Sequence, residues 1–361
     1  MNDRAWVATR KGLFELRHSA GRWAIAKHSF IGEPVSMLLP PQALGRMLAA
    51  LNLGHFGVKV HASDDSGQTW HEVATPSYPP QPETAPGAAA GAAWKLVQIW
   101  SMEAAGGTVW AGTLPGGLFR SADGGESWSL VESLWTKPER AEWFGGGYDV
   151  PGIHSICAHP QRPGEVLLGI SCGGAWRSED DGVHWALSAR GMRAGFMPPE
   201  RADDQNVQDP HLIVRCPARP ERLWCQHHNG IWRSDDNAAS WLEVSDVPAS
   251  NFGFAVAVHP NDGDTAWFVP AIADQTRIPR DGALVVNRTR DGGRSFETLR
   301  TGLPHNDCYD LVYRHGLAVS PSGMRLLMGS TTGSLWASDD AGEHWAVAAA
   351  HLPPIHAVRF A

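Results

Sequence analysis

The sequence predicts an all-β fold made of seven repeated four-stranded units. An eight-residue pattern, Ser-x-Asp-x-Gly-x-x-Trp, occurs as SDDSGQTW at 63, SADGGESW at 121, SEDDGVHW at 178 and SDDAGEHW at 338. Weaker copies are LRHSAGRW at 16, SDDNAASW at 234 and TRDGGRSF at 289. The intervals between successive copies run from 47 to 58 residues. Because a period near 50 residues is typical of propellers and repeat arrays, we predict a single seven-bladed β-propeller over residues 1–361.

Each repeat is predicted to contain four short strands. Residues 153–188 are an example, with strand-like runs IHSICAH, EVLLGIS, GGAWRS and HWALSA. The eight-residue pattern then forms the hairpin between the third and fourth strands. Its Ser and Asp side chains can accept backbone N–H groups across the turn, its Gly permits a positive φ, and its Trp packs between sheets. We therefore interpret the repeated acids as structural rather than catalytic.

The ends of the chain predict how the first blade is completed. The first-strand candidates of the other blades are PVSMLL (34), WKLVQIW (94), IHSICAH (153), HLIVRC (211), FGFAVAV (252) and YDLVYRH (309). The N-terminus instead begins with a second-strand run, AWVATR, and the C-terminus ends with a first-strand run within PPIHAVRFA. Residues 355–360 should complete the first blade and remove an exposed sheet edge. Helix should be nearly absent, and the glycines of the segment 83–94 favour a loop.

Composition narrows the functional classes. The net charge of −8 argues against a nucleic-acid surface, which needs a basic stripe. The sequence has no apolar run of about 20 residues and no signal-peptide core at its start, so we expect a cytoplasmic protein without a membrane partner. The five cysteines (157, 172, 216, 225 and 308) lack metal-site spacing and should be reduced. A small-molecule substrate is the expected partner, and the oligomeric state stays open.

Long loops on one face of the propeller are the predicted location of a site. With this strand order, the loops that follow each fourth strand share a face with the loops between second and third strands, opposite the repeated turns. Three such loops are long (72–93, 131–152 and 189–210), and the loop 270–281 is rich in charges. The candidate catalytic residues are Asp149, Asp209, Asp310 and Tyr309.

Several histidines are predicted near the axis on that face. The first residues of the first strands include His154, His211, His356, Lys95 and the pair Tyr309–Asp310. We expect His154, His211, His228 and His356 to be ligands of a divalent transition metal, Zn or Mn, with one position left for water. Two alternatives remain open: these histidines only line the pocket, or the site performs acid–base chemistry without metal. Substrate contacts are expected from Arg277, Arg280, Lys95, His55 and Tyr148, with the two arginines holding an anion.

The repeated pattern resembles the Asp box of BNR-repeat proteins, a group that includes sialidases, xyloglucanases, sortilin-type receptors and a photosystem assembly factor. The stretches GFMPPERADDQNVQDPH, CQHHNGIWRSDD and GFAVAVHP also resemble a bacterial group described as BNR-repeat glycosyl hydrolases or exo-α-sialidases. This resemblance implies a propeller and suggests hydrolysis, although one fold hosts many activities. Sialidases carry an Arg-Ile-Pro motif near the N-terminus, whereas Arg277-Ile278-Pro279 lies in the sixth blade here.

The expected function is a hydrolase for a small polar or anionic substrate, such as an ester or phosphoester, with metal assistance. One alternative is a metal-free, sialidase-like glycoside hydrolase that uses two carboxylates about 5–10 Å apart. The other alternative is a non-catalytic propeller that binds a ligand or a protein on its loop face.

Overall fold

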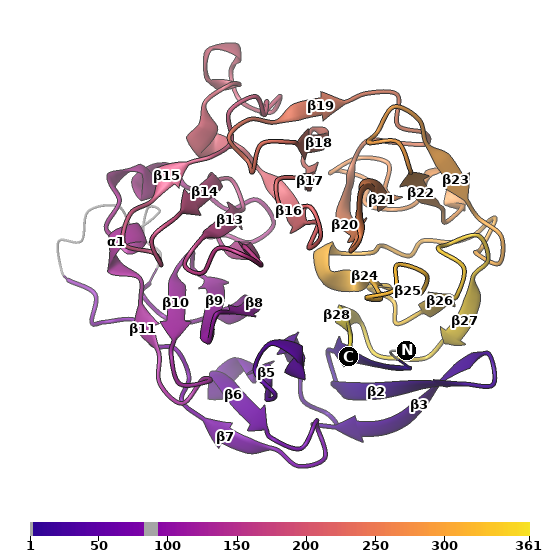
Figure 1. Cartoon of the computed structure of the whole chain (residues 1–361), viewed down its shortest axis with the longest axis horizontal. Coiled ribbons are helices and arrows are strands. Elements are labelled where there is room, and N and C mark those ends of the chain that lie inside the picture. The colour runs from indigo at the N-terminus through magenta and orange to yellow at the C-terminus, as the bar shows by residue number, and fades with distance from the viewer. Residues whose placement is uncertain (1–2, 83–92) are drawn as a thin grey trace. The chain divides into compact units, whose positions relative to one another are not determined.

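The computed structural model describes residues 3–82 and 93–361, so most of the segment 83–94 lies outside the described residues. Within the described ranges, the strands form seven four-stranded sheets, which are the blades of a seven-bladed β-propeller (Figure 1). The predicted fold class and strand number are confirmed. The chain divides into two compact units, which we describe separately: Met1–Val35, Val214–Asn237 and Leu242–Ala361 form the first, and Ser36–Ile213 with Ala238–Trp241 form the second.

The first unit contains three complete sheets. The first sheet has the order β28-β1-β2-β3, with β28 (Ile355–Phe360), β1 (Arg4–Thr9), β2 (Gly12–Ser19) and β3 (Arg22–Ser29). The second sheet consists of β20 (Gly253–His259), β21 (Asp262–Pro270), β22 (Val286–Thr289) and β23 (Glu297–Leu299). The third consists of β24 (Leu317–Val319), β25 (Leu326–Gly329), β26 (Leu335–Ser338) and β27 (Ala346–Ala349).

The second unit contains most of the sheet β4 (Val35–Leu39), β5 (Met47–Asn52), β6 (Val58–Ser63) and β7 (His71–Val73). Its next sheet has β8 (Gln98–Ala105), β9 (Thr108–Leu114), β10 (Leu118–Ser121) and β11 (Ser129–Leu130). A third sheet has β12 (Ile153–Ala158), β13 (Val166–Ile170), β14 (Gly174–Ser178) and β15 (Ala186–Leu187). The seventh sheet of the chain is continuous in hydrogen bonding and consists of β16 (Pro210–Arg215), β17 (Leu223–His227), β18 (Gly230–Ser234) and β19 (Leu242–Val244).

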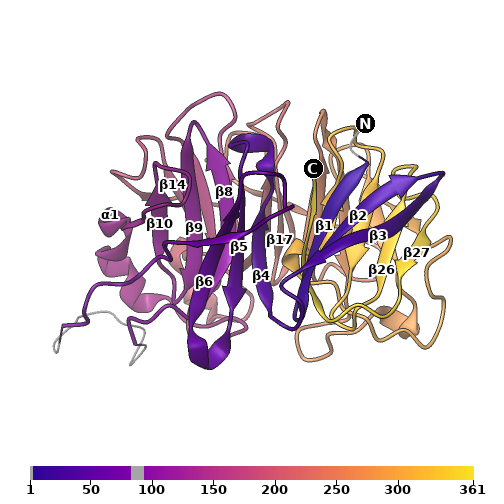
Figure 2. The same ribbon diagram turned by 90° about the horizontal axis from the view of Figure 1, so that it is seen from below.

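The C-terminal strand completes the first sheet, as the sequence predicted. Strand β28 pairs antiparallel with β1, with Val358 opposite Val7 and Ala357 opposite Ala8. The two ends of the chain accordingly lie close together (Figures 1 and 2). The apolar side chains of this pair are buried, and Val7 and Val358 are fully inaccessible to solvent. The two ends of the chain are thereby held in one sheet, and β1 has no unpaired edge.

The repeated turns have the predicted local structure. In the turn after β6, the Ser63 hydroxyl accepts the N–H of Gly67 at 2.7 Å, and Gly67 has a φ of 84°. The Asp65 carboxylate accepts the N–H of Thr69 at 2.8 Å. The tryptophans connect neighbouring sheets: Trp128 donates its indole N–H to the carbonyl of Ala74 at 3.0 Å. The repeated residues therefore fix hairpins and blade contacts, which confirms the structural interpretation.

Buried apolar side chains form a core in each unit. In the second unit, one cluster includes Trp110, Leu168, Trp176 and Trp185. In the first unit, one cluster includes Trp267, Leu326, Trp336 and Trp345. The five cysteines are free and buried, as the sequence predicted. Because a buried Leu or Trp side chain contributes roughly 1.5–3 kcal/mol by leaving water, these clusters stabilise the blades.

Two first-strand assignments were wrong. Lys95 precedes the strand, because β8 begins only at Gln98. Tyr309 and Asp310 also lie outside a strand, because the sheet begins at β24, Leu317–Val319, after a 3-10 turn. Residues 309–313 form a loop before η7 in which Leu311 and Val312 are buried, so its apolar residues pack into the core without pairing in the sheet.

Helical structure is sparse among the described residues, as the sequence predicted. One α-helical turn, α1, spans Glu132–Trp135, where Leu134 and Trp135 are buried. Short 3-10 turns are η1 (Pro41–Ala43), η2 (Gly54–Phe56), η3 (Pro138–Glu142), η4 (Pro199–Arg201), η5 (Gln205–Val207), η6 (Arg280–Gly282) and η7 (Arg314–Gly316). Among the described residues, no helix has the length and apolar character needed to cross a bilayer.

Candidate functional site

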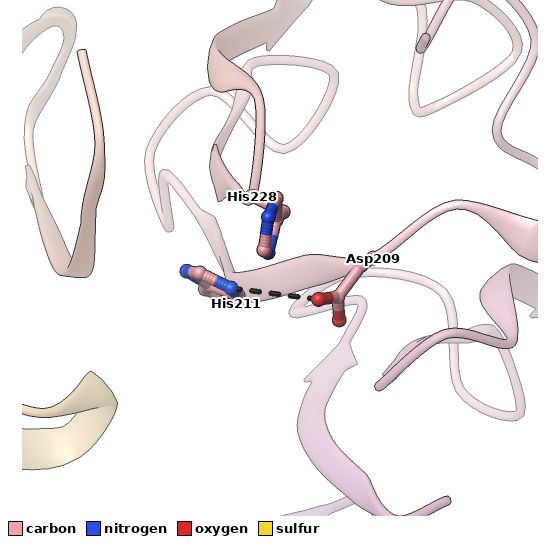
Figure 3. Close-up of side chains that lie close together, drawn as sticks. All are labelled: Asp209, His211 and His228. Atoms are coloured by element: carbon pink, nitrogen blue, oxygen red, sulfur yellow. Dashed lines mark ion pairs between the residues drawn. The ribbon is translucent and has the colours of Figure 1, made fainter. Parts of the chain in front are cut away.

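A buried carboxylate–imidazole pair lies at the start of β16. Asp209 directly precedes the strand and His211 is its second residue, so the two side chains are two positions apart on an extended backbone and point to the same side. Both residues are 1% exposed. The His211 Nε2 atom lies 3.5 Å from Asp209 Oδ2 (Figure 3). Because burying a carboxylate without partners is costly, and buried titratable groups cluster at functional sites, we take this pair as the candidate site.

The turn between β13 and β14 holds the other oxygen of Asp209. The backbone N–H of Cys172 donates to Asp209 Oδ1 at 3.1 Å. Cys172 is 3% exposed and has a φ of 43°, a conformation that few non-glycine residues adopt. The carboxylate is therefore oriented from one side by a backbone amide while its second oxygen faces His211.

A glycine-rich loop closes over this carboxylate. The N–H of Phe144 donates to the carbonyl of Cys172 at 3.3 Å, which fixes the loop to the turn. A Cβ atom on Gly146 would lie 2.9 Å from Cys172 Sγ and 3.1 Å from Asp209 Oδ2. Only glycine leaves enough room at this position. Cys172 and Gly146 were not among the predicted site residues. The run FGGGY in a long loop was the signal that could have identified Gly146.

His228 joins this pair in a group that could hold a metal ion. It lies in the turn between β17 and β18, in the same hydrogen-bonded sheet as β16. One potential ligand atom from each of Asp209, His211 and His228 lies within 4.8 Å of the others (Figure 3). Two imidazoles and one carboxylate are a donor set that suits Zn²⁺ or Mn²⁺. The structure thus brings Asp209, which the sequence predicted as a catalytic acid or base, together with two of the four histidines predicted as metal ligands.

The third predicted histidine, His154, lies within an aromatic group of the second unit. It is fully buried, and its Nδ1 lies 2.9 Å from the Ser155 hydroxyl. The Trp100 ring makes edge contacts with both His154 and Tyr148, at centroid distances of 5.3 and 5.1 Å. Tyr148 is 46% exposed, so it is placed at the surface of this group. His154 is therefore packed against an aromatic ring and lies outside the group formed by Asp209, His211 and His228.

Other predicted site residues belong to the first unit. Asp310 accepts hydrogen bonds from the Ser330 hydroxyl at 2.5 Å and from the Thr332 hydroxyl, while Tyr309 is 63% exposed. His356 has its Nδ1 2.9 Å from the carbonyl of Val35. Burial lowers the pKa of His356, which favours the neutral imidazole.

The predicted substrate contacts are dispersed. Arg277 is paired with Asp274 at 2.5 Å and its guanidinium lies 5.3 Å from the Phe254 ring centroid, so its charge is already compensated. Arg280 is exposed and donates its Nε–H to a backbone carbonyl. The remaining three predicted site residues are exposed: Asp149, Lys95 and His55.

Comparison with solved structures shows the fold. A xyloglucanase of glycoside hydrolase family 74 from Xanthomonas campestris aligns with a TM-score of 0.64 at 18% identity, over 96% of this chain and 53% of that one. The protein YCF48, solved with a bound D1 peptide, aligns with a TM-score of 0.55 at 15% identity, over 94% and 90% of the two chains. A candidate 6-phosphogluconolactonase from Bacteroides uniformis aligns with a TM-score of 0.63 at 12% identity over the full length of both.

The chain spans only about half the length of the xyloglucanase, and 38% of an ancestral family 74 enzyme. At these identities the similarity establishes the propeller fold alone. No protein-family model and no curated protein matches the sequence. The Asp-box family therefore remains a resemblance based on the repeated turns.

Proposed function

We propose that this propeller is a metal-assisted hydrolase of small polar or anionic substrates, with Asp209 and His211 at its reactive centre. The observation that supports the proposal is the buried Asp209–His211 pair, 3.5 Å apart, with His228 in the same ligand group. A buried acid beside an imidazole contributes little to stability compared with apolar residues of similar volume, and titratable groups in such surroundings cluster at functional sites.

The donor set is suited to a catalytic rather than a purely structural metal. Structural zinc sites use four protein ligands, whereas catalytic sites use three and leave a position for water or substrate. Asp209, His211 and His228 would be the three ligands. Bound there, a divalent metal would lower the pKa of a coordinated water toward neutrality and polarise a substrate oxygen.

The protein residues around the pair would orient the ligands. The Cys172 N–H holds one oxygen of Asp209, which leaves the other oxygen directed at His211. Such fixed partners preserve ligand geometry, and their removal from known metal sites reduces affinity or activity by about 10–100-fold. The loop at Gly146 passes so close to the carboxylate that a side chain at this position would contact Cys172 and Asp209.

The substrate class follows from this chemistry. A centre with one acid and two imidazoles that could hold a metal is suited to esters, lactones or phosphoesters, in which a single water adds to a polarised carbonyl or phosphoryl group. The similarity in fold to glycoside hydrolases and to a candidate lactonase is compatible with hydrolysis but does not select a substrate.

The test is a hydrolysis screen of the full chain after chelation and after reloading with Zn²⁺ or Mn²⁺. Chromogenic esters, lactones and phosphoesters would be compared with chromogenic glycosides. The proposal expects turnover of an ester or phosphoester that depends on the added metal and is lost in His211→Ala. The control is His184→Ala, because His184 is a histidine of a repeated turn whose side chain is 86% exposed. Metal-independent glycoside cleavage would contradict the proposal and support the glycosidase alternative.

A further inference from the structure

A separate hollow in the first unit combines apolar walls with two arginines. It has a volume of about 90 Å³, enough for several water molecules or a small organic molecule. It is formed by the segment before β20, the end of β21, the turn η6 and the residue after β23. Its lining residues are Ala249, Ser250, Pro270, Ala271, Arg280, Asp281, Ala283, Val285 and Arg300.

The Arg280 side chain is held in position by the backbone. Its Nε–H donates to the carbonyl of Ala249 at 2.6 Å. This bond uses one of the five guanidinium N–H groups and leaves the terminal nitrogens able to donate to another group. Asp281, the next residue, has a φ of 56°, so the chain reverses sharply at the rim of the hollow.

Neither arginine of the hollow is neutralised by an ion pair. Among residues 3–82 and 93–361, no carboxylate lies within 4 Å of the charged nitrogens of Arg280 or Arg300. Neighbouring arginines differ, since Arg277 pairs with Asp274 and Arg288 pairs with Glu297 and Glu343. Two unpaired guanidinium groups at one hollow are an electrostatic signal for an anion.

The walls of the hollow indicate that the uncharged part of a bound anion would be apolar. Pro270, Ala271, Ala283 and Val285 present an apolar surface, and Ala271 and Val285 are 2% and 7% exposed. Ser250 already donates to the carbonyl of Ile272 and accepts the N–H of Phe252. Few polar groups are therefore available besides the charged rim. An apolar body with one charged group would fit this arrangement.

We infer that this hollow binds a small monocarboxylate whose apolar body lies against the alanine and valine wall and whose carboxylate meets Arg280 and Arg300. The lining residues include two arginines and one aspartate, so the lining has an excess of one positive charge, which suits a monoanion. A dianionic phosphate would carry more negative charge than this lining compensates. The inference is independent of the centre at Asp209 and His211.

Benzoate and its neutral counterpart benzamide are the probes for a titration of the full chain, followed by calorimetry or ligand-observed NMR. We expect benzoate to bind at least about tenfold more tightly than benzamide, which corresponds to one charge-assisted hydrogen bond. The double variant Arg280→Ala/Arg300→Ala should lose this preference. The matched control Arg294→Ala removes an exposed arginine of a repeated turn and should leave benzoate affinity unchanged.

A second variant distinguishes binding in the hollow from nonspecific attraction of benzoate to surface charge. Ala283→Leu retains both arginines but fills the cavity, and it should reduce benzoate affinity at least about tenfold, the effect of blocking a small site. Equal affinity for benzoate and benzamide, absence of benzoate binding, unchanged binding in Ala283→Leu, or tighter binding of inorganic phosphate than of benzoate would each overturn the assignment.

Discussion

Asp65 and Asp209 are both aspartates that accept backbone hydrogen bonds, yet their surroundings differ in kind. Asp65 lies in a repeated turn, is exposed, and accepts both the N–H and the hydroxyl of Thr69. Asp209 is 1% exposed and has an imidazole beside it. The hydrogen bonds of Asp65 close a local turn, whereas those of Asp209 orient an acid toward a residue that can ligate metal or transfer a proton. Repetition marks the structural acids, and burial beside a histidine marks the candidate functional one.

The largest expected effect comes from removing the charge of Asp209. Asp209→Asn preserves side-chain size but weakens both the ligand set and the interaction with His211. We expect the activity identified in the hydrolysis screen to fall by more than about 10–100-fold, the loss seen when a residue that only supports a metal ligand is removed. Steady-state kinetics on the metal-loaded protein would measure it. Asp123→Asn, in a repeated turn, is the control and should retain activity; equal losses in the two variants would abolish the distinction.

Gly146 and Gly147 allow a sharper test of the same site. Gly146→Ala would force a Cβ to within 3.1 Å of Asp209 Oδ2, so the carboxylate must move. We expect activity to fall by about 10–100-fold, because small displacements of a catalytic group are costly. Gly147→Ala meets no atom within 4 Å and should behave as wild type. If the two variants have the same kinetic constants, the loop does not shape the site.

In a repeated turn, Ser121→Ala should lower stability without affecting activity. The Ser121 hydroxyl is buried and accepts the N–H of Gly125 at 2.8 Å. Its removal leaves a buried donor unsatisfied, and we expect the free energy of unfolding to fall by about 1–3 kcal/mol. Denaturant unfolding would measure the change. Ser129→Ala, at an exposed position in the same sheet, should change stability by less than about 0.5 kcal/mol. An unchanged free energy of unfolding in Ser121→Ala would contradict the role assigned to the turn.

The smallest expected effect is a dependence of stability on acid pH. The Ser127 hydroxyl lowers the pKa of Asp123 to about 2, the His184 N–H lowers that of Asp180 to about 2, and the Ser295 hydroxyl does the same for Asp291. Because the folded-state pKa lies below the unfolded value of about 3.9, each acid stabilises the fold above pH 4. This contribution is lost as pH falls from about 4 to 2.

Thermal unfolding midpoints recorded between pH 2 and pH 6 would follow this loss. Asp123→Asn removes one titrating group, so its stability should fall less steeply over that range than the stability of the wild type. A steeper fall in the variant would show that the turn acid is not stabilised by its hydrogen bonds. This prediction concerns only the acids of the repeated turns and is independent of the centre at Asp209.

The repeated turns could be predicted because their information is local. Ser63, Asp65 and Gly67 lie within one turn, and the same chemistry recurs at regular intervals along the chain. The closing strand β28 was predictable because each end of the chain lacked what the other supplied. The prediction of a strand at 309–315 failed because apolar residues can be buried without pairing in a sheet. Leu311 and Val312 are buried in a loop there.

The candidate site was only partly predictable. Asp209 and His211 stand two residues apart, so their shared orientation can be read from a strand assignment. Cys172 and Gly146 come from other segments, and their proximity to Asp209 depends on how loops fold over the sheet. No spacing in the sequence encodes that proximity. The two predicted arginines could not be told apart in the sequence. In the structure, Arg277 is paired with Asp274, whereas Arg280 donates to a backbone carbonyl.

The most direct test of the central claim is the metal content of the purified full chain, measured by mass spectrometry before and after reconstitution with Zn²⁺ and Mn²⁺. The same measurement would be made on His211→Ala, His228→Ala and the control His184→Ala. We expect about one transition metal per chain in the wild type and in His184→Ala, and its loss in His211→Ala and His228→Ala. A reconstituted wild type that holds no metal, or equal metal content in all four proteins, would contradict it.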